Sequence, residues 1–317
     1  MLPVIKKAGR LLASERRMTI NICHVGYNEH KPIFDDVIDS LRSAFCRLGV
    51  PHRYSLNYVD PGAINLMIGH VSFIEKRELP PGGLKNTIIF QLESLTEGSL
   101  LEKCPYYIEL LRQATQIWDY SPTNVAFLNS QGIHTAIHVP IGHDPILERI
   151  DHVENRDIDV LFYGAKMPRR TAILQSLINA GYKVEHIFGV YGGKRDGYIA
   201  RSKIVINIHQ FDKQVVEEVR LSYLLANRCF VVSEVADRDP YDGGVVFVPY
   251  DKLVETCAHY LNPASKAERD RLAERGHQAI QAYPFWRGVR AALLAKGGFP
   301  QLAQERAEWG QYWTTPA

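Results

Sequence analysis

The sequence lacks any long apolar run, and this absence excludes a transmembrane helix. No stretch of its 317 residues approaches the roughly 18 apolar residues that a transmembrane helix needs. The first 17 residues are basic and contain no apolar segment of about 7–15 residues, so we expect no secretory signal peptide. Residues 5–17 fit either a solvated extension or a basic amphipathic helix at a membrane surface. We therefore expect a cytoplasmic protein, with peripheral contact at the inner face of the membrane as a second possibility.

Cysteine is scarce and scattered, which excludes a disulfide framework and a zinc site. The five cysteines are odd in number and show no CxxC spacing. They are Cys23, Cys46, Cys104, Cys229 and Cys257. Such a distribution is typical of a protein from a reducing compartment.

An excess of charge of one sign is also missing. The chain has 37 basic and 35 acidic residues, a formal net charge of +2, whereas general nucleic-acid binders carry a strong basic excess. A GxGxxG motif is absent after the first expected strand, where the sequence reads HVGYNEH, and this argues against a dinucleotide-dependent dehydrogenase. Any binding of anions must therefore depend on local basic clusters.

What is present is a repeated alternation of short apolar strands and amphipathic helices. The length indicates about two domains, and 46% apolar residues suffice for a sizeable core. Expected strands cover residues 19–25, 63–68, 87–92, 116–120, 134–139, 159–163, 184–190, 204–209, 229–233 and 245–248. Expected helices cover residues 34–48, 106–114, 124–130, 171–180, 197–202, 217–225, 253–260 and much of 265–313, with residues 191–196 as a loop.

This alternation predicts an α/β protein with two parallel sheets. The polar stretch at 147–157 is the best linker, so we expect a basic extension at 1–18 and Rossmann-like domains at 19–150 and 151–262. We expect residues 263–317 to form a helical segment packed across both domains. Open parallel sheets bind ligands beyond the carboxyl ends of their strands, which places the site in the cleft between the domains.

A basic loop follows the first strand of the second domain. Gly164 lets the backbone approach a ligand closely, and Lys166, Arg169 and Arg170 place three cations near a helix start. Cations at a helix N-terminus oppose the helix dipole unless an anion joins them. The loop therefore predicts a site for a diphosphate.

Three further segments of the second domain carry polar residues at strand ends or helix starts. Candidate ligand contacts are Gly192, Arg195, Asn207, His209, Glu218, Arg220 and Ser222. A carboxylate that opens a helix, such as Glu218, can accept the hydroxyls of a ribose. For each segment a purely structural role, such as an exposed turn or a satisfied hydrogen-bonded pair, remains an alternative.

In their order along the chain these pieces resemble bacterial GT-B glycosyltransferases, especially the family-1-like and spore-maturation CgeB-like group. The resemblance covers roughly residues 19–260 and is carried by DVLFYGAKMPRR, YGGKRDGYIARSKIVINIH and EEVRLSYLLANRCFVVSE, with IIFQLES, IWDYSPTN and HVPIGH in the first half. It implies a GT-B fold with two facing Rossmann-like domains and transfer of a sugar from a nucleotide-sugar donor. Such a donor is a co-substrate, and no cofactor or metal is implied. Similar proteins act on surface polysaccharides, lipid-linked glycans or proteins.

The resemblance also implies roles for single residues. Gly164, Arg169 and Arg170 would meet the diphosphate, Asn207 and His209 would line the donor cleft, and Glu218 would hold the ribose with Arg220 nearby. Many retaining members have a second glutamate eight positions after the first. Here Leu225 and Ala226 occupy those positions, which leaves the stereochemistry open.

An inverting transfer needs a general base on the acceptor side. Candidates at strand ends of the first half are Glu93, His70, His24 and Asp119, with Glu93 as first choice because it ends an apolar strand. His24 would otherwise be a core histidine, and Asp119 would hold a turn. Asp237-Arg-Asp239 resembles a metal-binding DxD motif, but we expect a solvated turn there.

Two other function classes remain open at this point. One is a different sugar-nucleotide enzyme on the same architecture, such as an epimerase. The other is a non-catalytic two-lobed sugar-binding protein, against which the missing signal peptide counts. Binding of nucleotides distinguishes the enzymes from the binding protein.

Overall fold

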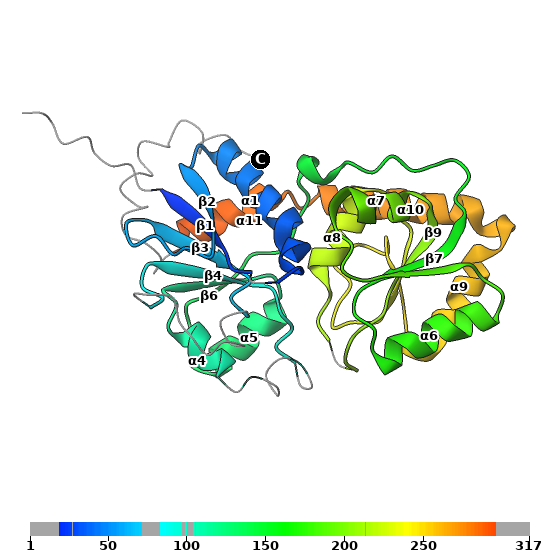
Figure 1. The fold of residues 1–317 in the computed structure, drawn as a ribbon, viewed down its shortest axis with the longest axis horizontal. Coiled ribbons are helices and arrows are strands. Elements are labelled where there is room, and N and C mark those ends of the chain that lie inside the picture. The colour runs from blue at the N-terminus through cyan, green and yellow to red at the C-terminus, as the bar shows by residue number, and fades with distance from the viewer. Residues whose placement is uncertain are drawn as a thin grey trace, which may run out of the picture.

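The structure is a computed structural model that describes residues 19–26, 28–71, 83–96, 99, 104, 106–212 and 214–295. The amphipathic helix considered at 5–17 and the part of the tail beyond 295 lie outside these residues. Two α/β halves lie side by side (Figure 1). No helix among the described residues is both long enough and apolar enough to cross a membrane.

The first half is built on a parallel sheet of six strands in the order β2-β1-β3-β4-β5-β6. The strands are β1 (Ile20–His24), β2 (His52–Leu56), β3 (Ile64–Ile68), β4 (Thr87–Gln91), β5 (Gln116–Asp119) and β6 (Ala136–His138). The helices are η1 (Lys31–Phe34), α1 (Asp35–Leu48), α4 (Tyr107–Arg112), α5 (Pro122–Ser130) and η2 (Pro145–Leu147). Apolar side chains of α1 pack on one face of the sheet, and those of α4 and α5 pack on the other.

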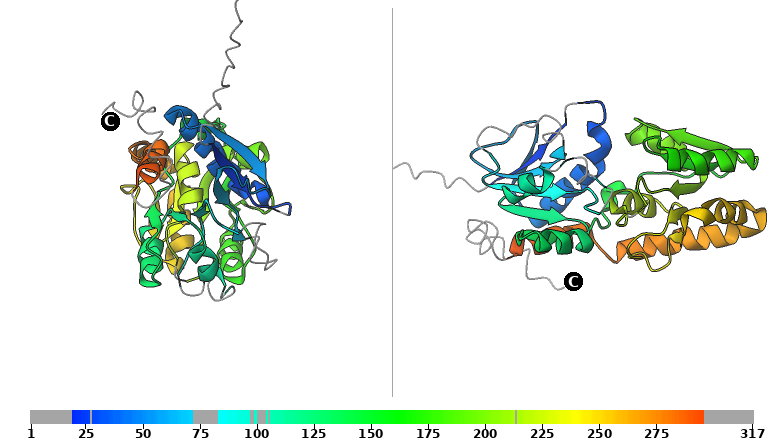
Figure 2. Two further views of the ribbon diagram at one scale, coloured as in Figure 1. Left: turned by 90° about the vertical axis from the view of Figure 1, so that its left-hand side faces the viewer. Right: turned by 90° about the horizontal axis from the view of Figure 1, so that it is seen from below.

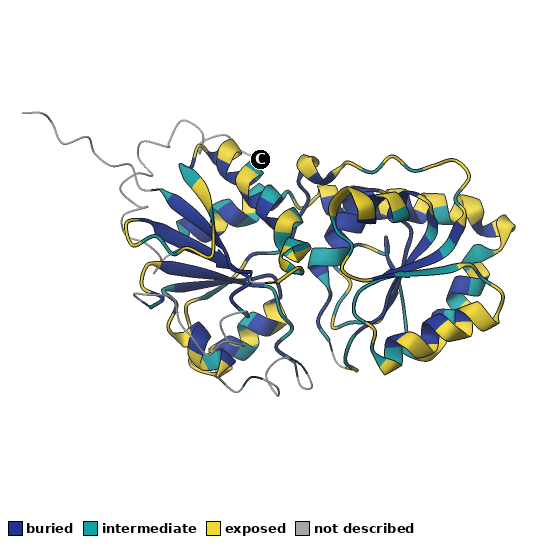
Figure 3. Ribbon diagram, viewed as in Figure 1, coloured by how far each residue is buried: buried dark blue, intermediate teal, exposed yellow. Residues whose placement is uncertain are grey.

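The second half repeats the design with five parallel strands in the order β11-β10-β9-β7-β8. The strands are β7 (Ile158–Tyr163), β8 (Val184–Ile187), β9 (Ser202–Asn207), β10 (Val231–Glu234) and β11 (Val246–Val248). The helices are α6 (Pro168–Asn179), α7 (Gly192–Ala200), α8 (Glu218–Ala226), η3 (Tyr250–Lys252), α9 (Leu253–Leu261), η4 (Pro263–Ser265) and α10 (Lys266–Gln281). The central strands are buried and the helices expose their outer faces (Figure 3).

The last helix, α11 (Phe285–Leu294), returns to the first half. Figure 2 shows this orange helix lying against the first half. It packs against α1, and Phe285 and Val289 join the core of the first sheet. The chain thus crosses between the halves twice, and the crossings touch where His143 pairs with Pro284 in a parallel bridge. A side chain at Gly142 would place its Cβ only 2.0 Å from the carbonyl oxygen of Tyr283, so glycine is needed for this contact.

The predicted α/β class with two parallel sheets is confirmed, two local predictions are wrong, and one strand was not predicted. Residues 191–196 are not a loop, because α7 begins at Gly192 and runs through the expected short helix to Ala200. The strand predicted at 184–190 ends at Ile187, and Gly189 has a positive φ of 69°. Strand β2 was missed because it is an edge strand whose side chains are mostly exposed, so it lacks an apolar pattern.

Candidate functional site

A cavity of about 340 Å³ lies between the halves, at the carboxyl ends of strands from both sheets. From the first half it is lined by residues 33, 34 and 36 at the start of α1 and by residues 92–94 and 120, which follow β4 and β5. From the second half it is lined by residues 163–165, 170, 187–191, 195, 210, 214, 217–220 and 223. This is the place where paired parallel sheets are expected to bind ligands.

Arg170 is the cation of the predicted basic loop that faces the cavity. It lies in the first turn of α6 and is buried, with Nε donating to the carbonyl of Ile208 at 2.9 Å. Its Nη2 lies 3.9 Å from a carboxylate oxygen of Glu217. Burial lowers the pKa of Arg170 to about 10, so the group remains a cation at neutral pH.

Arg220 lies beside it, one turn into α8. Its Nη1 donates to Asn207 at 3.0 Å, and its Nε lies 3.4 Å from Glu217. Gly164 lies next to Arg220, and its φ of 148° is a backbone conformation that residues with a side chain rarely adopt. Arg170 and Arg220 thus flank Glu217 on one wall of the cavity.

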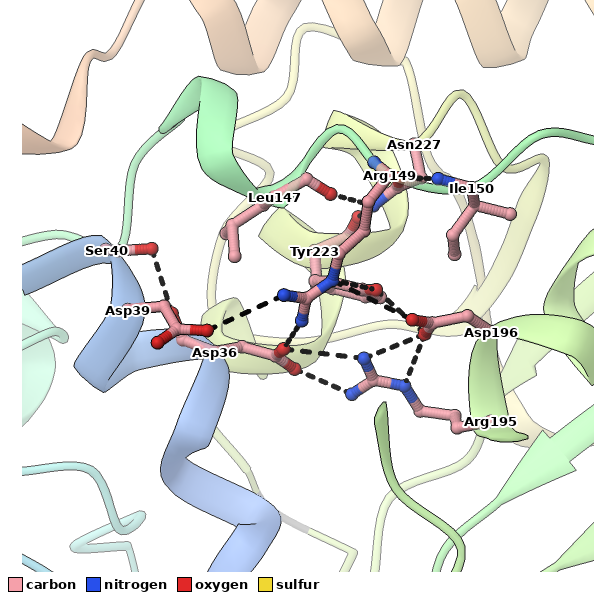
Figure 4. A network of polar contacts seen from close by, with 10 residues as sticks. All are labelled: Asp36, Asp39, Ser40, Leu147, Arg149, Ile150, Arg195, Asp196, Tyr223 and Asn227. Atoms are coloured by element: carbon pink, nitrogen blue, oxygen red, sulfur yellow. Dashed lines mark hydrogen bonds and ion pairs between the residues drawn. The ribbon is translucent and has the colours of Figure 1, made fainter. Parts of the chain in front are cut away.

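Arg195 is a third cation in the cavity, but it belongs to an ion-pair network (Figure 4). Its Nη1 donates to Asp36 of α1 at 2.6 Å, and its Nη2 donates to Asp196 at 2.9 Å. Burial opposes the charge, yet the hydrogen bond with Asp36 raises the pKa of Arg195 above its ordinary value. Gly192, predicted beside it, instead lines a second cavity of about 530 Å³ together with Asp36 and Arg149.

On the opposite wall, Glu93 follows β4 and faces the cavity. Burial, together with the negative charge of Glu217, raises the pKa of Glu93 to about 7. Among the described residues, its carboxylate has no ion-pair partner. A carboxyl group with a pKa near neutrality is suited to accept a proton during a reaction.

Uncharged amides hold the backbone of Glu93 in place. Gln91 accepts from the Glu93 N–H at 2.6 Å and donates to its carbonyl at 2.7 Å. Asn124 donates to the same carbonyl at 2.9 Å and accepts from the N–H of Leu95 at 3.0 Å. Both amides also donate to the buried carboxyl group of Asp119. Asp119 therefore supports the loop of Glu93 and does not face the cavity.

The two histidines predicted as bases also lie outside the cavity. His70 stacks on Tyr107, bonds its hydroxyl through Nε2 at 2.8 Å, and has its pKa lowered to about 3 by burial. His24 is bound at both ring nitrogens, by the hydroxyl of Tyr54 at 3.0 Å and the carbonyl of Lys31 at 3.1 Å. In this arrangement both rings are held by contacts within the first half, away from the cavity.

Glu218, predicted to hold a ribose, touches the cavity but has both carboxylate oxygens engaged. One accepts from the backbone N–H of Ile141 at 2.9 Å, and the other pairs with Arg238. Burial raises the pKa of Glu218 to about 7. Both oxygens are thus already engaged, and the bond with Ile141 ties α8 to the segment that leaves the first half.

Several other predicted donor contacts are not brought to the cavity. Those outside its lining are Lys166, Arg169, Asn207, His209 and Ser222. Lys166 is exposed, whereas Arg169 is held by Glu234 at 2.5 Å and Asp212 at 2.8 Å. His209 is buried, and neither ring nitrogen has a hydrogen-bond partner among the described residues.

The sequence interpretation missed an aromatic end of the cavity. Phe188 and Tyr191 follow β8 and are joined from the first half by His30, whose Nδ1 lies 2.8 Å from the Tyr191 hydroxyl. The His30 and Phe188 rings are 4.8 Å apart. Their position directly after a strand is the signal that could have identified them.

The Asp237-Arg-Asp239 segment forms turns and a contact between the halves. Asp239 accepts from the N–H groups of Tyr241 and Gly243, and Asp237 accepts from the hydroxyl of Thr123 at 2.5 Å. Among the described residues, no three histidine, cysteine or acidic side chains are grouped as metal ligands would be.

No protein-family model matches the sequence. Among curated proteins, an uncharacterised protein of Acanthamoeba polyphaga mimivirus is 28% identical over 237 residues, which cover 66% of this chain and 77% of that protein. A second uncharacterised protein of the same virus is 33% identical over 160 residues, covering 48% of this chain and 55% of its own length. The similar sequences thus indicate a shared fold without naming an activity.

Solved structures are more informative about the architecture. Anabaena HepE, determined in complex with UDP and glucose, matches with a TM-score of 0.54 and 9% identity over 93% of this chain and 99% of that one. T4 phage BGT, determined with its UDP-glucose substrate, matches with a TM-score of 0.53 and 11% identity over 88% of this chain and 100% of that one. At such low identity the likeness shows the fold alone. With its two parallel sheets and its returning C-terminal helix, the chain has the GT-B fold.

Proposed function

We propose that this chain is a glycosyltransferase that moves a sugar from a nucleotide-sugar donor to an acceptor hydroxyl. One observation carries the proposal: the cavity sets Arg170 and Arg220 on one wall opposite the Glu93 carboxylate, with its raised pKa, on the other. The fold supports it, as does the resemblance of the strand-end motifs to the CgeB-like group. The residues around the cavity, rather than the fold, point to the chemistry.

The donor binds to residues of the second half, 151–262. Arg170 and Arg220 meet the diphosphate, because guanidinium groups donate paired hydrogen bonds to phosphate oxygens. The aromatic rings of Phe188 and Tyr191, at one end of the cavity, bind the nucleobase of the donor. Glu217, rather than the predicted Glu218, accepts the hydroxyls of the ribose, because its carboxylate lines the cavity between the two arginines.

The acceptor binds on the side of the first half, 19–150, where Glu93 acts as the general base. The acceptor oxygen bonds to the anomeric carbon of the sugar, the bond from that carbon to the diphosphate breaks, and the acceptor proton passes to Glu93. Arg170 and Arg220 stabilise the charge that gathers on the departing diphosphate, so the step needs no metal ion. Acceptors of this chemistry are glycans, lipid-linked glycans and proteins.

Nucleotide binding is the first test. The purified protein is titrated by calorimetry and thermal unfolding with UDP, GDP, CDP, dTDP and ADP and with their sugars. The UDP and UDP-glucose of the similar structures make UDP the first to try. A ligand at about 100 times its Kd should stabilise the fold by about 2.7 kcal/mol. No binding of any of these ligands would contradict the proposal, and turnover without release of nucleoside diphosphate would favour an epimerase instead.

A further inference from the structure

Asp36 places a negative charge of the first half on a cation of the donor cavity (Figure 4). It lies in the first turn of α1, and its Oδ2 accepts from Nη1 of Arg195 at 2.6 Å. Its Oδ1 pairs with Arg149 from the segment that connects the halves. Asp36 and Arg195 both line the cavity of about 340 Å³. A site proposed to bind a diphosphate therefore holds one of its cations already neutralised.

Arg195 does not depend on Asp36 for its position. Its Nε and Nη2 both donate to Oδ1 of Asp196, at 3.1 and 2.9 Å. Its guanidinium carbon lies 4.1 Å from the centre of the Tyr223 ring, and the Tyr223 hydroxyl donates to the same Asp196 oxygen at 2.8 Å. Removal of Asp36 would take away charge while these contacts continue to hold the guanidinium.

Asp36 also forms an ion pair with a second cation, Arg149. Arg149 is fixed through its backbone N–H, which donates to Asn227 at 2.9 Å, and through Nε, which donates to the Tyr223 hydroxyl at 3.2 Å. If the ion pair between Asp36 and Arg195 breaks, the ion pair between Asp36 and Arg149 remains. The exchange therefore costs one ion pair, and a phosphate oxygen on Arg195 would replace it.

We infer that Asp36 is an internal counter-ion that competes with the diphosphate of the donor for Arg195, an inference that rests on the proposed function. Without ligand, Asp36 neutralises Arg195. In the bound state the diphosphate takes Arg195 and Asp36 keeps Arg149. After transfer, Asp36 returns to Arg195 and favours departure of the nucleoside diphosphate, a step that limits turnover in many enzymes. Asp36 thus sets how tightly the cleft holds phosphorylated ligands.

The test compares D36N with the wild-type protein by calorimetry. The ligands are the nucleoside diphosphate that wild type binds best, among UDP, GDP, CDP, dTDP and ADP, and the matching nucleoside. D36N should bind the diphosphate about tenfold more tightly, a modest share of the coupling between close buried charges, and should bind the nucleoside as wild type does. D39N is the matched control, because Asp39 lies one turn further on α1 and faces Arg149 at 3.6 Å but does not line this cavity.

Each outcome decides the matter. Equal or weaker diphosphate binding by D36N, with wild-type binding intact, overturns the inference alone. Equal tightening for diphosphate and nucleoside also overturns it, because a loosened cleft would affect both. Failure of wild type to bind any of the nucleotides overturns the proposed function and this inference with it. If D36N does not fold because Arg149 loses one of its acidic partners, the double variant D36N/R149Q removes one charge of each sign and should show the same tightening.

Discussion

The two walls of the cavity hold their charged groups in opposite ways. In the second half, Arg170 and Arg195 have carboxylates 3.9 and 2.6 Å away, so these cations are partly neutralised. In the first half, the backbone of Glu93 is held by the amides of Gln91 and Asn124, which carry no charge. The arginines are therefore balanced by ion pairs, one of them with Asp36 from the first half, whereas Glu93 is desolvated and has no ion-pair partner among the described residues.

This difference decides what each wall can do. Nearby cations would favour the ionised form of a carboxylate and lower its pKa, as they do at ordinary salt bridges. Around Glu93, burial dominates and the negative charge of Glu217 adds to its effect, so the pKa of Glu93 rises to about 7. The first wall is thus suited to move a proton and the second to bind an anion.

The largest effect should come from E93Q. The amide keeps the size of the side chain but cannot accept the acceptor proton, so sugar transfer should fall by about 10²–10⁴-fold. Binding of the nucleoside diphosphate should stay near its wild-type value, because the arginine wall is untouched. E109Q on α4, outside the cavity lining, is the control in assays of transfer and calorimetry. Wild-type turnover in E93Q would remove Glu93 from the mechanism.

R220Q should have the next largest effect, on binding rather than on proton transfer. A hydrogen bond to a charged group contributes about 1.5–3 kcal/mol, so the affinity for nucleoside diphosphate should fall by roughly 10–100-fold. The matching nucleoside should bind as before, because the change removes a phosphate partner. R228Q, at an exposed position just beyond α8, is the control. Equal losses for nucleoside and diphosphate would show a collapsed site instead.

Much of the fold could be predicted because apolar periodicity is a local property of the sequence. The central strands β4, β7 and β9 are continuous apolar runs, and their expected positions differ from the structure by one or two residues. The edge strand β2 has an exposed face and gives no such signal. The helix at 192–200 was hidden by two glycines in its first turn, since glycine disfavours helix interiors but is tolerated at an N-terminus.

The residues of the site were harder to predict than the fold. The rule that ligands bind beyond the carboxyl ends of parallel strands identifies a loop, but not which of two neighbouring residues faces the ligand. Consecutive residues on a helix differ in direction by roughly 100°. Arg169 and Arg170 were both predicted, yet only Arg170 lines the cavity, while Arg169 pairs with Glu234. Likewise Glu217 stands between the arginines, whereas Glu218 binds Ile141 and Arg238. Those partners lie far away in the sequence, so only the tertiary structure shows them.

N124A tests whether the uncharged scaffold positions Glu93. The variant leaves the Glu93 carbonyl with one amide fewer and the Leu95 N–H without its acceptor. We expect unfolding in urea to show a loss of about 2 kcal/mol and kcat to fall by about tenfold, with an unchanged donor KM. N129A, exposed on the same helix, should change neither. A stability loss without a fall in kcat would show that Asn124 is structural only.

The smallest effect should be a shift in the pH profile of E217Q. Transfer needs ionised Glu93, so kcat/KM for the acceptor, at saturating donor, should rise with pH through about 7 in wild type. Because the charge of Glu217 helps to raise the pKa of Glu93, E217Q should move this rise to lower pH.

The pH dependence of the free energy of unfolding should differ between wild type and E217Q for the same reason. Glu93 keeps its proton in the folded state up to about pH 7, but in the unfolded chain it loses the proton near its ordinary pKa of 4.5, so wild type loses stability as the pH rises across that interval. E217Q should flatten this fall in urea unfolding curves, whereas E255Q, on the exposed surface of α9, should leave it as it is. If the pH profile of kcat/KM is the same in E217Q as in wild type, burial alone raises the pKa of Glu93, and the charge of Glu217 on the opposite wall has no effect on it.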